Sequence, residues 1–132
     1  MQTLKTRAEF QRVRAGRKWV APAFILQGLA RDSADTGNPR FGFTISSKSV
    51  AKESPGAKRR GKAVDRNRAR RRLKEAVRLT FAEHADAGFD YVIIGRASAL
   101  TRNFVDLLAD MRLAFHKVSQ PRHSGKERNP IL

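Results

Sequence analysis

The segment GKAVDRNRARRRLKEAVR, residues 61–78, places eight basic residues in about five helical turns. Like charges at helical spacing repel one another, so this crowding is unfavourable unless an anion faces it. At about 100° per residue, the less polar side chains from here to residue 80 share one arc of a helix: Ala69, Leu73, Ala76, Val77 and Thr80. The pattern predicts a helix that packs on a protein core through this stripe and presents its arginines to a polyanion.

The basic side chains lie on both sides of the apolar stripe. One flank carries Arg66, Arg70 and Lys74 at i, i+4 spacing, with Asn67, Arg71 and Arg78 beside it, and the other flank carries Arg68 and Arg72. The planar fork of arginine binds phosphate through two contacts and also stacks on bases. A solvated helix face normally mixes both signs of charge, whereas acids are scarce here. We therefore interpret this helix as a nucleic-acid interface.

The charge of the whole chain supports the same interpretation. The formal net charge is +16 and the isoelectric point is near 11.6. Residues 48–78 hold 13 basic and 3 acidic residues, whereas the other 101 residues hold 15 basic and 9 acidic ones. A localised basic region indicates a directed contact with nucleic acid or an anionic surface, and disfavours a neutral small-molecule substrate.

Length and composition fit one globular domain. The chain has 132 residues, of which 40% are hydrophobic. The absence of cysteine excludes disulfides, thiolate metal sites and a cysteine nucleophile. The sequence shows neither a signal-peptide pattern nor an apolar stretch long enough to cross a bilayer. We expect a cytoplasmic protein without a membrane partner.

Three segments read as strands. Residues 20–29 are rich in apolar residues, and residues 40–46, RFGFTIS, alternate between large apolar and small or hydroxylated side chains. The turn-rich residues 32–39 between them predict an antiparallel hairpin. Residues 90–95, DYVIIG, form an apolar run that predicts a central strand, buried on both faces. The small side chain of Gly42 predicts a close approach to the backbone on its face of the sheet.

Two further helices complete the expected fold. Residues 6–9, TRAE, match a capping box and predict a helix to about residue 15. Residues 101–118 predict an amphipathic helix, capped by Thr101 or Asn103, whose stripe is Phe104, Leu108, Met111, Phe115 and Val118. The order α-β-β-α-β-α predicts an α/β sandwich, a small sheet with helices over one face. We expect a single domain over residues 1–118, with a basic loop at 49–61 and a disordered basic tail at 119–132.

Catalytic patterns are weak in this chain. His84, His116 and His123 have no metal-ligand spacing, and the sequence contains neither a P-loop nor a nucleophile elbow. We expect no catalytic residue and no metal ligand on the protein itself. The phenylalanines allow two interpretations, core packing or a platform on which unstacked bases lie.

The string DRNRARRRL, residues 65–73, after GKAV, residues 61–64, resembles the RNR signature of the protein subunit of bacterial ribonuclease P. The neighbouring segments fit in the same order: EFQRVRAGRKWVAPAFIL at residues 9–26, RFGFTISSK at 40–48 and FDYVIIGR at 89–96. The resemblance covers residues 4–118. It implies a small mixed sheet with helices packed over it and a left-handed βαβ crossover, like domain 2 of ribosomal protein S5.

The same resemblance implies the function. Members are basic protein cofactors of a catalytic RNA that removes the 5′ leader from precursor tRNA, and the RNA with its bound Mg²⁺ carries out the hydrolysis. It implies that the catalytic RNA is contacted by Arg66, Asn67, Arg68, Arg70, Arg71, Arg72, Lys74, Lys62 and Lys48. It implies that the single-stranded leader lies in a cleft beside the N-terminal helix, near Phe10, Arg12, Arg17, Phe24 and Phe41.

The chain also departs from the family pattern. Residues 49–60 are an insertion rich in basic residues, and Lys62 replaces a usual asparagine. Arg14 stands where an aromatic residue is common, and Gln27 where some members have tyrosine. We expect charge to replace part of the leader stacking and the insertion to add phosphate contacts. A structural RNA-binding protein of ribosomal type and a protein-only nuclease remain the alternatives, and the nuclease lacks the carboxylate cluster it would need.

Overall fold

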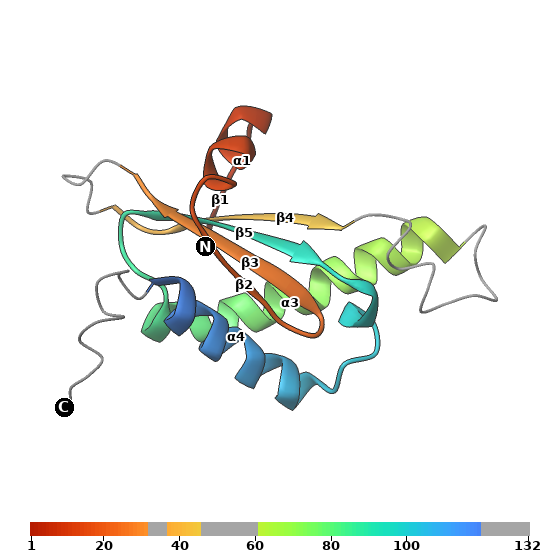
Figure 1. The fold of residues 1–132 in the computed structure, drawn as a ribbon. Helices are drawn as coiled ribbons and strands as arrows, with labels where there is room; N and C mark the ends of the chain where they lie inside the picture. The colour runs from red at the N-terminus through yellow and green to blue at the C-terminus, as the bar shows by residue number, and fades with distance from the viewer. Residues whose placement is uncertain (32–36, 46–60, 120–132) are drawn as a thin grey trace, which may run out of the picture.

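A computed structural model describes residues 1–31, 37–45 and 61–119 of the chain. In this part of the chain five strands form one mixed sheet in the order β1-β4-β5-β3-β2 (Figure 1). The strands are β1 (Gln2–Thr3), β2 (Arg17–Val20), β3 (Phe24–Ala30), β4 (Arg40–Ile45) and β5 (Phe89–Gly95). The helices are α1 (Arg7–Val13), α3 (Gly61–His84), the 3-10 turn η2 (Ala97–Ala99) and α4 (Phe104–Ser119). The predicted class, a small mixed sheet with helices packed over it, is confirmed.

The strand β5 lies at the centre of the sheet. It pairs antiparallel with β3 from Phe89 to Gly95, and parallel with β4 from Asp90 to Gly95. The prediction of a central strand is therefore confirmed. Because β4 and β5 are parallel neighbours joined through α3, they form a βαβ unit. The hand of its crossover stays a prediction from the family resemblance.

The predicted hairpin between residues 20–29 and 40–46 is wrong. The apolar strand β5 lies between β3 and β4, so those two strands are not neighbours. The hairpin is formed instead by β2 and β3, in which Val20 pairs with Ile25 and Trp19 with Leu26. The sequence around Pro22 interrupts what reads as one strand, because proline has no backbone N–H for a ladder bond.

Helices α3 and α4 cover one face of the sheet (Figure 1). The predicted stripes face inward, since Leu73 and Val77 of α3 and Met111 and Phe115 of α4 are fully buried. The strands contribute alternate residues to this core, namely Phe24, Leu26, Phe41, Ile45, Tyr91 and Ile93. On α4 the cap is Asn103, whose Oδ1 accepts hydrogen bonds from the backbone N–H groups of Val105 (2.9 Å) and Asp106 (3.3 Å).

The short helix α1 lies on the opposite face of the sheet (Figure 1). The expectation of helices over one face therefore holds for α3 and α4 but not for α1. The capping box is confirmed, because Thr6 Oγ1 accepts from the backbone N–H of Glu9 (3.2 Å) and Glu9 Oε1 accepts from that of Thr6 (3.0 Å). A Cβ at Gly42 would lie 2.5 Å from the Phe10 ring, so the glycine lets this ring lie on the sheet as predicted.

Several predictions fall outside the described residues. They concern Lys48, the insertion at residues 49–60 and the tail at residues 120–132, and the side chain of Lys62 is also not described. Within the described ranges, no helix is both long and apolar enough to cross a membrane.

Candidate nucleic-acid interface

The first candidate surface is the outer side of α3. Ala69 and Leu73 are fully buried against the sheet, which turns the basic flanks outward. Asn67, Arg68, Arg71 and Lys74 are exposed, and Arg66 and Arg70 are half-buried. Among the residues that the structure describes, Arg66, Arg68 and Arg71 form no ion pair with a carboxylate. Their charge is available to an external anion, as the sequence pattern predicts.

Arg72 behaves differently from its neighbours on α3. Its Nη1 donates to the Ala99 carbonyl (2.7 Å), its Nη2 donates to the Arg102 carbonyl, and its guanidinium lies 5.9 Å from the centroid of the Phe104 ring. These contacts fasten the connection between β5 and α4 onto α3. The placement of Arg72 at the RNA is therefore corrected: its Nη1 and Nη2 groups bind the connection to α4, whereas Arg68 on the same flank is exposed.

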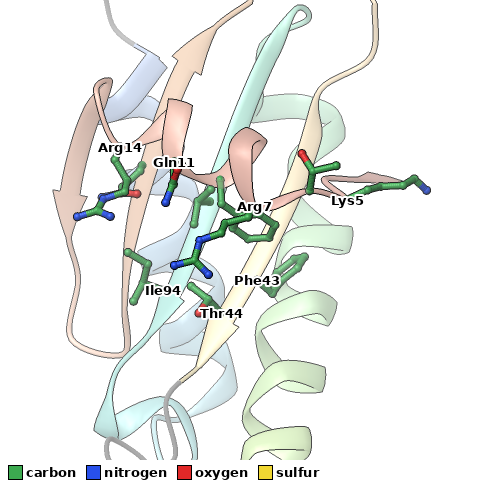
Figure 2. A pocket seen from close by; sticks show the side chains of 11 residues that line it. Lys5, Arg7, Gln11, Arg14, Phe43, Thr44 and Ile94 are labelled. Atoms are coloured by element: carbon green, nitrogen blue, oxygen red, sulfur yellow. The ribbon is translucent and has the colours of Figure 1, made fainter.

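The second candidate surface is a groove between α1 and the sheet, with a volume of about 620 Å³ (Figure 2). Its lining residues come from α1 with the segment before it and from three strands, and they are Lys5, Thr6, Arg7, Phe10, Gln11, Arg14, Gln27, Phe43, Thr44, Val92 and Ile94. Figure 2 shows Arg7 reaching from α1 toward Thr44 and Ile94. None of these described lining residues is acidic.

The groove combines three kinds of group. Lys5, Arg7 and Arg14 supply positive charge at its rim, and Phe10 supplies aromatic surface. Phe43 also lines the groove, but its ring packs against the main core and lies 5.9 Å from Lys74 Nζ of α3. The side-chain oxygen of Gln27 is buried and has no hydrogen-bond partner within the described structure. Cationic rims with aromatic platforms are typical of sites for single-stranded nucleic acid.

The structure corrects part of the predicted leader site. Phe10 lines the groove, but Phe24 and Phe41 are fully buried on the other face, under α3 and α4. Phe41 stacks on Tyr91 at 5.6 Å between ring centroids. The physical reason is the period of two in strands, which sends these rings to the face opposite α1. They belong to the core and cannot contact RNA there.

The two predicted leader arginines also lie outside the groove lining. Arg17 is exposed on β2 and lines a separate cavity of about 380 Å³ beside Gly28 and Phe89. Arg12 turns to the buried carboxylate of Asp90, with 3.0 Å between Arg12 Nη2 and Asp90 Oδ2.

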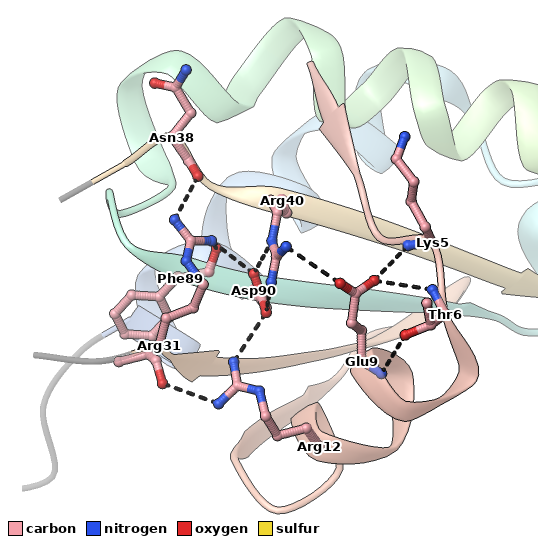
Figure 3. Close-up of polar contacts among 10 residues, drawn as sticks. Lys5, Thr6, Glu9, Arg12, Arg31, Asn38, Arg40, Phe89 and Asp90 are labelled. Carbon is pink, nitrogen blue, oxygen red and sulfur yellow. Dashed lines mark hydrogen bonds and ion pairs between the residues drawn. The ribbon is translucent and has the colours of Figure 1, made fainter. Parts of the chain in front are cut away.

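Asp90 is a site residue that sequence reasoning missed. Its fully buried carboxylate accepts hydrogen bonds from Arg12, Arg31 and Arg40 (Figure 3). Burial on its own would raise the pKa of Asp90, but the bonds from Arg40, Arg31 and Arg12 outweigh it and lower the pKa to about 2. The available signal was an acidic residue at the start of a strand that is otherwise apolar.

Sequence reasoning also missed most of the groove lining, including its floor. Val92 and Ile94 line the groove, whereas Tyr91 and Ile93 between them face the core. Alternation within residues 90–95 separates these two sets of residues, but it assigns one set to a groove only when a helix is expected on each face of the sheet.

A family comparison decides the class of the protein. The family model described as Ribonuclease P matches residues 1–53 and 56–119. The chain belongs to this family. The ribonuclease P protein component of Paramagnetospirillum magneticum is 45% identical over 131 residues, which cover 96% of this chain and 90% of the relative. That of Gluconacetobacter diazotrophicus is 43% identical over 115 residues, with 86% and 88% covered.

Solved structures show the same fold. The RNase P protein of Staphylococcus aureus superposes with a TM-score of 0.66 at 21% identity, covering 91% of this chain and 96% of that one. The RNase P protein from Thermotoga maritima gives a TM-score of 0.66 at 19% identity, covering 89% and 98%. Family membership places the chain in ribonuclease P, a ribonucleoprotein of tRNA processing, and identifies it as an RNA-binding protein.

Proposed function

We propose that this ribonuclease P family member is a protein cofactor with two RNA sites, one for the catalytic RNA and one for the 5′ leader of precursor tRNA. The observation that carries the proposal is the presence of two basic surfaces on opposite faces of one sheet. The α3 surface carries exposed arginines beside a buried apolar stripe. The α1 groove carries a cationic rim and aromatic walls.

The α3 surface is the proposed site for the catalytic RNA. Its contacts are Arg66, Asn67, Arg68, Arg70, Arg71 and Lys74, with Lys62 and Lys48 added from the sequence pattern. Arg70 Nη1 lies 3.5 Å from Asn67 Oδ1, which orients this pair on the helix surface. Support comes from the exposure of these side chains and from the ability of arginine to bind phosphate bidentately.

The groove is the proposed site for the leader. Lys5, Arg7 and Arg14 are placed to neutralise phosphates, and Phe10 offers a surface for bases. Stacking of a base on an aromatic side chain contributes roughly 1–3 kcal/mol. This assignment keeps Phe10 from the expected leader site and removes Phe24 and Phe41. Binding the leader would favour precursor over mature tRNA and broaden the range of substrates that the enzyme uses.

The hydrolysis itself is assigned to the RNA and its bound Mg²⁺. The described residues contain no group of three or more histidine, aspartate or glutamate side chains placed to hold a metal ion. The protein's part is to bind and orient two RNA segments.

Reconstitution tests the proposal. The purified chain is expected to leave precursor tRNA uncleaved, and to accelerate leader removal when it is added to a cognate catalytic RNA at low Mg²⁺. Positive charge from the protein should replace part of the Mg²⁺ that the RNA needs to fold and bind substrate. Absence of stimulation would favour a structural RNA-binding protein of ribosomal type, and cleavage without RNA would favour a protein-only nuclease.

A further inference from the structure

The carboxylate of Asp90 accepts hydrogen bonds from three arginines (Figure 3). Oδ1 accepts from Arg31 Nη1 at 2.8 Å and from Arg40 Nε at 2.9 Å. Oδ2 accepts from Arg12 Nη2 at 3.0 Å and from Arg40 Nη2 at 2.8 Å. An ionised carboxylate has about four acceptor positions, so all of them are occupied.

These bonds connect α1 to the sheet. Arg12 comes from α1 and Arg40 from β4, while Asp90 lies on β5. Arg40 also makes an ion pair with Glu9 of α1, at 3.4 Å between Nη1 and Oε2. Arg12 Nη1 also donates to the Ala30 carbonyl of β3 at 3.5 Å. Helix α1 is thus attached to three strands through Glu9 and Arg12, which lie one turn apart on the same side of the helix.

Strands β1 and β2 attach the two ends of α1 to the sheet, but the helix itself has few apolar contacts. It has seven residues, and isolated helices shorter than about 12–15 residues are marginal in water. Only Val13 is fully buried, with Phe10 partly buried beside it. The other side of the same helix forms the groove wall through Arg7, Phe10, Gln11 and Arg14. The bonds of Arg12 to Asp90 and of Glu9 to Arg40 fasten the middle of the helix between these two ends, and so contribute to the orientation of this wall.

We propose that Asp90 is a positioning residue for leader binding, which holds α1 over the sheet and so fixes the shape of the groove. The inference rests on the proposed leader site. Asp90 lies in the same row of β5 as Val92 and Ile94 of the groove floor, but its acceptors are occupied by arginines, so it acts without contacting RNA. A wall that is already ordered binds its ligand more tightly, because less freedom is lost on binding.

The direction in which RNA affinity changes on one substitution separates this role from bulk electrostatics. Asp90→Asn removes a negative charge from a protein of net charge +16, and long-range attraction alone would then bind RNA more tightly. The positioning role predicts the opposite for the leader, because the amide group places two donors against the arginine donors. Asp106→Asn is the matched control, since it changes the charge equally at an exposed position on α4.

The experiment measures binding of precursor tRNA to the reconstituted holoenzyme under conditions that block cleavage. Each protein is tested with a long leader and with a one-nucleotide leader, and the affinity ratio reports the leader contribution. For Asp90→Asn we expect this ratio to fall about tenfold, while the affinities for the one-nucleotide substrate and for the RNA subunit stay unchanged. For Asp106→Asn we expect the wild-type ratio.

Each outcome decides the matter. A wild-type ratio in Asp90→Asn, or an equal loss with both substrates, overturns the positioning role while the leader site stands. A wild-type protein without any leader advantage overturns both. If Asp90→Asn does not fold, Glu9→Gln replaces it, because glutamine also serves in a capping box but lacks the charge that pairs with Arg40. A smaller ratio then supports the role, and an unchanged or larger one overturns it.

Discussion

Three arginines, Arg12, Arg31 and Arg40, surround the carboxylate of Asp90, and a fourth, Arg72, binds two backbone carbonyls. These cations stabilise the fold and are not available to bind RNA in the same way as Arg68 or Arg71. In a chain with 28 basic residues, the surroundings of each arginine therefore decide its role. Two predictions at the scale of single residues follow from these surroundings.

The first concerns Arg72 and Arg68. Arg72→Ala leaves the Ala99 and Arg102 carbonyls without their donor, so we expect the free energy of unfolding to fall by about 1–3 kcal/mol. Arg68→Ala removes an exposed side chain, so we expect a change within about 0.5 kcal/mol but weaker binding to the RNA subunit. Urea unfolding and RNA titration of both variants check this. Equal stability of the two would contradict the structural role of Arg72.

The second concerns acid stability. The pKa of Asp90 is about 2 in the folded protein against an ordinary value of 3.8, so the folded state prefers the ionised form. Its contribution, about 2 kcal/mol, is fully present above about pH 5 and is lost as the pH falls through 2. Unfolding at pH 7, 4 and 2 should show a steeper loss for the wild type than for Asp90→Asn. Parallel curves for the two proteins would refute this account.

At the scale of elements, α3 joins an apolar stripe to exposed basic flanks, and the insertion at residues 49–60 adds further basic residues just before it. Deletion of this insertion should flatten the salt dependence of RNA affinity, by about 0.7–0.9 in log–log slope for each phosphate that the shortened protein no longer binds. Filter binding across a range of salt concentrations measures the slope. An unchanged slope would mean that the insertion binds no phosphate.

The helices could be predicted more fully than the sheet. The stripes of α3 and α4 depend on local periodicity, and Leu73 and Met111 are buried where it places them. Strand neighbours depend on contacts between distant residues, so local patterns do not predict that β5 lies between β3 and β4 in the sheet. The assignment of Phe24 and Phe41 to the leader came from the family resemblance, and the alternation of their strands places both rings in the core instead. The Asp90 cluster was out of reach because it also joins distant residues, since Arg12 lies 78 positions from it in the sequence.

At the scale of the molecule, the sheet separates the two proposed RNA sites. The α3 surface lies with the main core and the α1 groove lies with the small cluster of Leu4, Val13 and Val92. The two sites have no lining residue in common, and the contact between them is that of Lys74 Nζ with the Phe43 ring at 5.9 Å, which involves neither Arg7 nor Arg68. Changes at distant sites without shared partners usually add in free energy.

This separation predicts independent effects of Arg68→Ala and Arg7→Ala. Arg68→Ala should weaken assembly with the RNA subunit whatever the substrate, and Arg7→Ala should weaken binding only of precursors with a long leader. The double variant should show the sum of the two free-energy changes within about 0.5 kcal/mol. Titrations of the RNA subunit and of both substrates measure this. A large departure from additivity would mean that one surface acts through the other.

The alternation of β5 also has a consequence for folding. Asp90, Val92 and Ile94 face α1, and Tyr91 and Ile93 face α3 and α4. A slip of one residue in strand pairing would exchange the two sets and drive the aspartate into an apolar layer without its arginines. Burial of an unpaired carboxylate is among the most expensive errors that a folding chain makes. The cost of burying Asp90 without its arginines therefore disfavours a sheet whose β5 pairing is shifted by one residue.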